Sequence, residues 1–183
     1  DTLLPVFLSA AEKFQRQCRE KPLFLLPRAS TVNEQTLLDA GVALYRQEID
    51  IHIVDEQRYD LMAACDAIIA ASGTVTLEIL LLETPMVVAY KVSPMSYRLG
   101  RVLVNIDYFC LVNLIAGKEI VRELLQDDAN PGAIAAELHR LVFDESRQLE
   151  QLEGYREVRA RLGKSGASAK AAALALSCLN SDG

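Results

Sequence analysis

Residues 67–90 decide the fold, and they read AIIAASGTVTLEILLLETPMVVAY. Two fully apolar runs, at 67–71 and 86–90, flank a segment at 75–82 that has the composition of an apolar helix. A short apolar run is typical of a strand buried on both faces, and strands that alternate with helices pair in parallel. The stretch therefore predicts a strand–helix–strand unit inside a parallel sheet that helices cover on both faces.

The same alternation continues toward the N-terminus. The elements expected there are a helix over 3–18, a buried strand over 23–26, a helix over 31–40 ending at Gly41, a strand over 49–53 and a helix over 56–64. In the second of these strands Ile49, Ile51 and Ile53 alternate with polar residues, which predicts one wet face and a place near the sheet edge. Right-handed crossovers between such strands give a Rossmann-like layered fold.

Helices are expected to dominate after Tyr90. The elements expected there are a helix over 94–104, a long loop over 105–118, a short helix over 119–126, a helix from Pro131 to about Phe143 with Asn130 as its N-cap, a charged helix over 145–162 and an Ala-rich helix over 167–179. We therefore predict the α/β class, with a Rossmann-like domain over 1–143 and C-terminal helices over 144–183.

Composition excludes several classes of protein. The 183 residues are 51% apolar and 24% charged, which is typical of one globular domain, or two at most, and excludes a disordered or fibrous chain. The formal net charge of −6 provides no overall basic field for nucleic acid, so a phosphate ligand needs a local site. No apolar run is long enough to span a bilayer.

The cysteines and histidines predict no metal site. The four cysteines form no CxxC pair, and the chain has two histidines. Unpatterned cysteines fit a reducing compartment. The chain shows no signal peptide and begins at Asp1 rather than Met, so we expect it to begin inside a longer protein.

Ser72, Gly73 and Thr74 stand where a buried strand is expected to give way to a helix. Open parallel sheets bind ligands beyond the carboxyl ends of their strands, and the free N–H groups of a first helical turn favour phosphate. Gly73 would let the backbone approach such a ligand closely. The alternative is an ordinary strand–helix turn in which Ser72 or Thr74 caps the helix.

Glu78 is a second candidate ligand. It lies four residues after Thr74, whereas a capping box places the acid three residues after the cap, so capping does not account for it. A carboxylate on an apolar helix needs a partner, and both hydroxyls of a ribose can donate to one carboxylate. The alternative is an exposed acid that pairs with a nearby base.

Two further segments are candidates. Residues 107–119 are expected to form a long loop, in which Asn113 would donate to a phosphate or sugar oxygen and Gly117 would permit a tight turn. The alternative is that Asn113 only hydrogen-bonds its own loop. Residues 95–103 predict an amphipathic helix with Arg98 and Arg101 outside its apolar face, which suits an anionic membrane surface, or otherwise a core helix with a solvated face.

Several blocks of sequence resemble the lipid-A-disaccharide synthase family. In chain order they are ASGTVTLE at 71–78, TPMVVAYK at 84–91, Asp107-Tyr108, NLIAGKE at 113–119, ELLQ at 123–126, and the tail from Leu162-Gly163 through Gly166-Ala167-Ser168. The ordered series covers nearly the whole chain and is specific, although the SGT…E pattern alone is shared by many glycosyltransferases.

The resemblance implies one half of a two-domain GT-B glycosyltransferase, a hexosyltransferase of lipid A and lipopolysaccharide synthesis. Such an enzyme transfers a sugar from UDP-2,3-diacylglucosamine to 2,3-diacylglucosamine 1-phosphate, which forms a β-1,6-linked disaccharide and releases UDP. Residues 1–143 would then bind the UDP-sugar donor, without a metal or another cofactor. The implied location is the bacterial cytoplasm, peripheral on the inner face of the inner membrane.

The residues that the resemblance assigns to the donor are Ser72, Gly73, Thr74, Glu78, Asn113 and Gly117. Helix-terminal amides at 72–74 would stabilise the leaving diphosphate. Glu78 would avoid the phosphates and meet the ribose, and Asn113 would be the catalytic residue that orients the diphosphate or the donor sugar.

This chain departs from the family pattern in two ways. The family carries a Pro-Gly-Ser-Arg motif just before the first helix and an N-terminal acceptor domain with the expected catalytic base, and neither is present here. The family usually has Pro before the loop Asn, where this chain has Val112. We therefore expect the chain alone to be inactive, to need the N-terminal domain as a partner, and to expose an apolar face that favours a homodimer. The alternatives are another UDP-sugar GT-B transferase domain and a non-catalytic nucleotide-binding or protein-interaction module.

Overall fold

The computed structural model describes residues 3–91, 108–163, 166, 169–173 and 175. Within them the strands form two parallel sheets, one of β1 (Leu23–Pro27) and β2 (Asp50–Val54), and one in the order β3 (Ile68–Ala71), β4 (Met86–Tyr90) and β5 (Glu123–Leu125). The helices are α1 (Leu4–Gln15), α2 (Glu34–Leu37), the kinked segment η1 (Leu38–Val42), α3 (Ala43–Tyr45), α4 (Arg58–Ala64), α5 (Val75–Leu81), α7 (Leu111–Ala116), α8 (Pro131–Phe143) and α9 (Glu145–Leu162).

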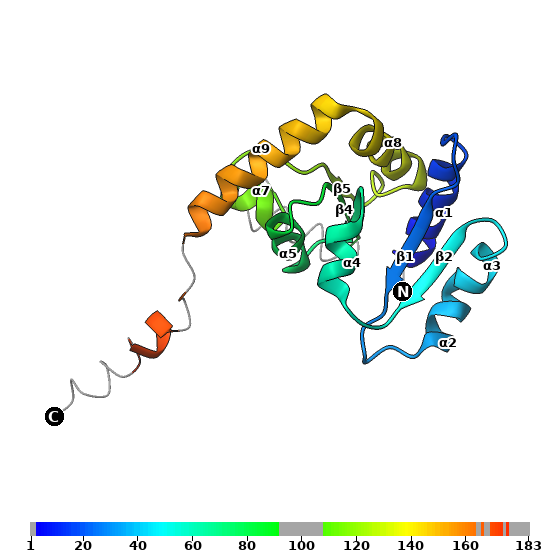
Figure 1. Cartoon of the computed structure of the whole chain (residues 1–183), viewed down its shortest axis with the longest axis horizontal. Helices are drawn as coiled ribbons and strands as arrows, with labels where there is room; N and C mark the ends of the chain where they lie inside the picture. Colours follow the sequence, from blue (N-terminus) through cyan, green and yellow to red (C-terminus); the bar gives the residue numbers. More distant parts are fainter. Residues whose placement is uncertain (1–2, 92–107, 164–165, 167–168, 174, 176–183) are drawn as a thin grey trace.

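The central strand β4 shows why the larger sheet is covered on both faces (Figure 1). Met86 and Val88 join a core formed with α5, α7 and α9, whereas Val87 and Ala89 join a core formed with α1 and α8. Successive residues of a strand point to opposite faces, so a strand between two helical layers needs an unbroken apolar run. The prediction of an α/β fold with parallel strands flanked by helices is confirmed.

Helix α1 also covers the smaller sheet. Its residues Leu8 and Ala11 pack with Ile51 of β2, while Asp50 and His52 on the same strand are exposed. This alternation confirms the wet face predicted for β2. Figure 1 shows β1 and β2 side by side, with α2 and α3 next to them.

Several predicted elements are confirmed within a few residues at each end: the helices α1, α4, α5, α8 and α9 and the strands β2, β3 and β4. Asn130 caps α8 as predicted, because its side chain accepts a hydrogen bond from the Ala133 N–H. The charged helix α9 is part of the main core, since Tyr155 and Val158 are buried against the residues of α5 and α7. The division after residue 143 stays a prediction.

Other predictions are wrong. The strands divide into two sheets rather than one, because the sequence alternation specifies parallel pairing but not where a hydrogen-bonded ladder is interrupted. The strand predicted over 23–26 is confirmed by β1, but its predicted burial is wrong, because β1 is only half-buried, with Leu23 57% exposed. The helix expected over 31–40 begins later than predicted, at Glu34. Its predicted end is confirmed, because Gly41, at φ 118°, has a non-helical backbone, and the chain turns there before α3.

Around the predicted loop the differences matter for the site. The described part of 105–118 contains a helix, α7, and the segment predicted as a helix over 119–126 contains the strand β5. A three-residue strand is too short to show alternation, and its identity comes from pairing with β4. The helix predicted over 94–104 and most of the one over 167–179 lie outside the described residues.

Candidate functional site

Ser72, Gly73 and Thr74 lie where the sequence predicts them, directly after β3 and before α5. Gly73 has φ 150°, in the region that favours glycine, although a Cβ there would have no atom within 4 Å. The backbone conformation therefore requires glycine, not the space around it. Thr76 Oγ1 donates to the Gly73 carbonyl at 2.7 Å and fixes this turn.

Neither hydroxyl of the motif caps α5. Ser72 Oγ donates to the carbonyl of Phe109 at 3.2 Å, and Thr74 occupies the N-cap position without a side-chain cap bond. The first backbone hydrogen bonds of the turn run from the N–H groups of Thr76 and Leu77. The N–H groups of Thr74 and Val75 precede them and have no acceptor within the helix, which leaves them directed to a ligand or to solvent.

Glu78 has a partner that the sequence does not reveal. Its Oε2 lies 3.1 Å from Nη2 of Arg58, the first residue of α4. This oxygen is buried, and although the ion pair is close, Oε2 makes no hydrogen bond. The structure therefore shows the acid–base pair that was the alternative for Glu78, and its contact with a ribose stays a prediction.

Arg58 is a site residue that sequence reasoning missed. The hydroxyl of Tyr59 accepts a hydrogen bond from Arg58 Nη2 at 2.8 Å, and this bond, followed by the charge of Glu78, raises the pKa of Arg58. The two ends of the ion pair are 20 residues apart, so no local pattern links Arg58 to Glu78. The sequence carried one indirect indication of Arg58. The helix expected after β2 begins beyond the carboxyl end of a strand, as α5 does, so both helices are expected to begin at the same edge of the fold.

Asn113 is buried in α7 with 0% exposure. Its Oδ1 accepts from the N–H groups of Ile120 and Val121 at 2.8 and 2.9 Å, and its Nδ2 donates to the Val121 carbonyl and to Glu123 Oε1, both at 2.7 Å. The side-chain amide of Asn113 thus hydrogen-bonds its own loop, which is the alternative given above for this residue. A direct contact between Asn113 and a ligand stays a prediction, and it would require one of these bonds to break.

Glu123 links this loop to the Ser72 turn. Its Oε2 accepts from the Phe109 N–H at 2.8 Å, and the Phe109 carbonyl accepts from Ser72. Three segments of the chain therefore meet at the backbone of Phe109. The sequence did not suggest this role for Glu123, because the residue was expected in a helix rather than at the start of β5.

Gly117 ends α7 in the left-handed conformation, at φ 69°, and its N–H donates to the Asn113 carbonyl at 2.8 Å. The tight turn predicted at Gly117 is confirmed. The residue is exposed, and its contact with a ligand stays a prediction.

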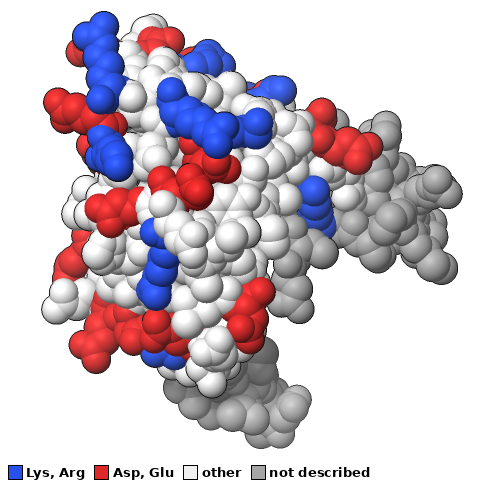
Figure 2. Space-filling model, turned by 90° about the vertical axis from the view of Figure 1, so that its right-hand side faces the viewer, with Lys and Arg blue, Asp and Glu red and all other residues white. Residues whose placement is uncertain are grey.

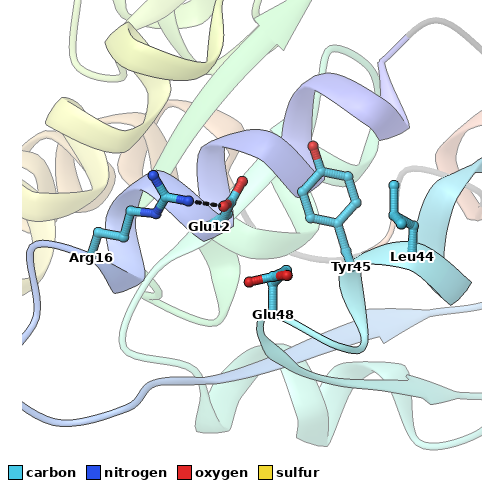
Figure 3. A pocket seen from close by; sticks show the side chains of 5 residues that line it. All are labelled: Glu12, Arg16, Leu44, Tyr45 and Glu48. Carbon is cyan, nitrogen blue, oxygen red and sulfur yellow. Dashed lines mark hydrogen bonds and ion pairs between the residues drawn. The ribbon is translucent and has the colours of Figure 1, made fainter.

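A groove elsewhere on the molecule is separate from these residues (Figure 3). Its lining comes from the C-terminal end of α1, with the C-cap residue Arg16, and from the segment between η1 and β2: Glu12, Arg16, Leu44, Tyr45 and Glu48. Glu12 and Arg16 form an ion pair across one turn of α1. None of the predicted site residues lines this groove.

The face of the molecule shown in Figure 2 carries no single-sign patch that would favour one class of charged ligand. On the face in Figure 2 acidic and basic side chains are interspersed rather than gathered by sign.

Across the described ranges no group of three or more His, Cys, Asp or Glu residues could hold a metal ion. No helix in the described part of the chain has the length and apolar character needed to cross a bilayer.

Comparisons with known proteins agree with one another. A family model described as lipid-A-disaccharide synthetase matches residues 1–176. Relatives named lipid-A-disaccharide synthase include one from Trichlorobacter lovleyi, 42% identical over 96% of this chain, and one from Geobacter sulfurreducens, 38% identical over 97%. A third, from Nitrosococcus oceani, is 40% identical over 88%. The match covers 45%, 45% and 41% of these relatives, so the chain spans less than half of their length.

Proposed function

This chain belongs to the lipid-A-disaccharide synthetase family, and we propose that it is the part of such a glycosyltransferase that binds the UDP-sugar donor. The reaction would transfer a sugar from UDP-2,3-diacylglucosamine to 2,3-diacylglucosamine 1-phosphate and release UDP. The observation that carries the donor assignment is the edge formed by Ser72, Gly73 and Thr74 after β3, with Glu78 one turn inside α5.

The diphosphate of the donor would lie against the Ser72–Thr74 turn. The N–H groups of Thr74 and Val75 have no acceptor in the helix, and Gly73 adds no side chain between the backbone and a ligand. Negative charge grows on the diphosphate as the glycosidic bond breaks, and preorganised N–H donors stabilise such charge. The N–H groups at the start of α5 would therefore help UDP to leave by stabilising the negative charge on its diphosphate.

Glu78 would accept hydrogen bonds from the ribose hydroxyls, because its carboxylate would repel the phosphates. Asn113 and Gly117 would act through the loop that they shape. Three bonds of Asn113 hold the backbone of Ile120 and Val121, and the fourth holds Glu123, which in turn accepts from the Phe109 N–H beside Ser72. The contribution that we assign to Asn113 is therefore to position this loop. The acceptor site and the catalytic base would come from the other part of the enzyme.

Attachment to the inner face of the bacterial inner membrane is part of the same proposal. It rests on the family and on the basic amphipathic pattern over 95–103, a segment outside the described residues. A homodimer and the N-terminal half of the enzyme remain the proposed protein partners.

Titration calorimetry of the purified chain with UDP, GDP and NAD tests the nucleotide assignment. We expect UDP to bind and the other two to bind at least about tenfold more weakly, since a site built for one base leaves unpaired polar groups with another. Equal binding of all three would favour a non-catalytic nucleotide module. Absence of UDP binding would contradict the proposal.

A further inference from the structure

The start of α4 places one cation next to the acid of the proposed nucleotide site. Arg58 follows Gln57, which has a left-handed backbone at φ 57° and ψ 36°. Such a conformation is uncommon for a residue other than glycine and persists where the surroundings hold it. The Gln57 carbonyl accepts from the Leu61 N–H at 2.9 Å, so the first turn of α4 begins at this residue.

The Arg58 guanidinium contacts two side chains through one nitrogen. Its Nη2 donates to Tyr59 Oη at 2.8 Å, and its Cζ lies 4.8 Å from the centroid of the Tyr59 ring. The same Nη2 lies 3.1 Å from Glu78 Oε2. The Arg58 side chain is 55% exposed, and an ion pair with that much solvent contributes little to stability. The pair is therefore of interest for where it places the Glu78 carboxylate rather than for stability.

The two oxygens of Glu78 are in different surroundings. Oε2 is buried beside Arg58 and makes no hydrogen bond, yet 29% of the side chain is exposed. Oε1 also makes no hydrogen bond within the described residues, but unlike Oε2 it is not buried, so it is the carboxylate oxygen that solvent can reach. A glutamate side chain loses rotamer freedom when it is ordered, and a group already held in its bound geometry avoids that cost on binding.

On the premise that the nucleotide binds as proposed above, we propose that Arg58 is a positioning residue that makes the site select ribose over deoxyribose. Braced by Tyr59, the guanidinium holds Glu78 Oε2, which leaves Oε1 turned outward to accept from the ribose hydroxyls. Arg58 acts through Glu78 and does not contact the ligand.

The test compares the affinities of UDP and 2′-deoxy-UDP for the native chain and for Arg58→Gln. In the variant we expect UDP to bind on the order of tenfold more weakly and 2′-deoxy-UDP to lose less than about threefold, because only the ribose contact is disordered. Arg58→Lys, which keeps the charge, should recover part of the preference for UDP. Tyr59→Phe, which removes only the bracing hydroxyl, should reduce the preference by a smaller amount.

Arg159→Gln is the matched control. Arg159 is 58% exposed and pairs with Glu83 at 3.4 Å, just beyond the other end of α5, so this variant removes a similar ion pair away from the site. We expect it to leave both affinities unchanged. Thermal melts of every variant establish that each is folded. If Arg58→Gln does not fold, Tyr59→Phe and Arg58→Lys still decide the test.

The failures are distinguishable. A native chain that binds no UDP overturns the proposed function together with this inference. A native chain that prefers UDP, and loses the preference in Glu78→Gln but not in the folded Arg58 variants, overturns the role of Arg58 alone. Equal weakening of both nucleotides in Arg58→Gln would assign the guanidinium to the phosphates and would also overturn it. In the double variant, a loss no larger than that of Glu78→Gln supports the proposal, because both residues then act as one unit.

Discussion

Asn113 Nδ2 donates to Glu123 Oε1 at 2.7 Å, and this bond joins α7 to the first residue of β5. The other oxygen of Glu123 accepts from the Phe109 N–H at 2.8 Å, and the Phe109 carbonyl accepts from Ser72. A continuous chain of hydrogen bonds therefore runs from the buried amide to the turn after β3. The loop and the turn are one structural unit, although 41 residues separate Ser72 from Asn113.

Replacing Asn113 with Ala should destabilise the protein by about 2–4 kcal/mol, because it leaves the buried N–H groups of Ile120 and Val121 without acceptors. Urea denaturation measures the change in the free energy of unfolding. Leu114→Ala, at a 52% exposed position of the same helix, is the control and should change it by less than about 0.5 kcal/mol. A normal unfolding midpoint for Asn113→Ala with weakened UDP binding would instead favour a direct role in the site.

Gly73 and Gly117 should differ in their tolerance of Asn. Gly117 has φ 69°, in the left-handed region that Asn visits, so Gly117→Asn should cost less than about 1 kcal/mol. Gly73 has φ 150°, outside that region, so Gly73→Asn should cost about 1–3 kcal/mol. A Cβ would have nothing within 4 Å at either position, so crowding cannot produce the difference. Chemical denaturation of both variants checks this order, and equal costs would contradict it.

Gly154 lets α9 approach Ile120. A Cβ at this position would lie 2.5 Å from Ile120 Cγ2 and 2.9 Å from both Cγ1 and Cδ1. Gly154→Ala should therefore destabilise the protein by about 1–3 kcal/mol despite the higher helix propensity of Ala. All three clashing atoms belong to one side chain, so Ile120→Ala should relieve the strain. The double variant should then cost less than the two single costs added together, and strict additivity would contradict this packing.

The parts of the fold that the sequence predicts are those with a long or regular pattern. The apolar runs of β3 and β4 and the alternation around Ile51 identify strands because burial on two faces or on one leaves a direct trace in composition. β5 has three residues and takes its structure from its ladder with β4, so only tertiary structure reveals it.

The candidate site divides in the same way. The Ser72–Thr74 turn follows from its place between a strand and a helix, and the turn at Gly117 follows from its glycine. The ion pair of Glu78 with Arg58 and the bond of Asn113 with Glu123 join different elements, and local pattern carries no information about such pairs. The predicted loop also concealed α7, because a six-residue helix around a buried amide shows no polar face.

The 183-residue chain alone should form no lipid A disaccharide. It spans less than half of its curated relatives, and a GT-B enzyme needs an acceptor site across the cleft from the donor. Loss of proximity and orientation alone can remove roughly 7–11 kcal/mol of catalysis. Mass spectrometry of reactions with both sugar substrates measures the product, and a full-length relative is the positive control. Disaccharide made by the chain alone would contradict this prediction.

Glu78→Gln should separate binding from stability. The ion pair with Arg58 has side chains that are 29% and 55% exposed, so its loss should cost no more than about 1 kcal/mol of stability. If Glu78 accepts from the ribose, the same change should weaken UDP binding by about 1.5–3 kcal/mol, the range for hydrogen bonds to a charged group.

Titration of UDP alongside a thermal melt gives both quantities on the same preparations. Arg159→Gln is again a suitable control, because it removes an exposed ion pair with Glu83 without touching the proposed site. A Glu78→Gln protein that melts markedly earlier and binds UDP normally would show that the carboxylate is a structural partner of Arg58. That result would also remove the main support for placing the nucleotide beside Ser72, Gly73 and Thr74, because the turn and the acid were assigned to one ligand.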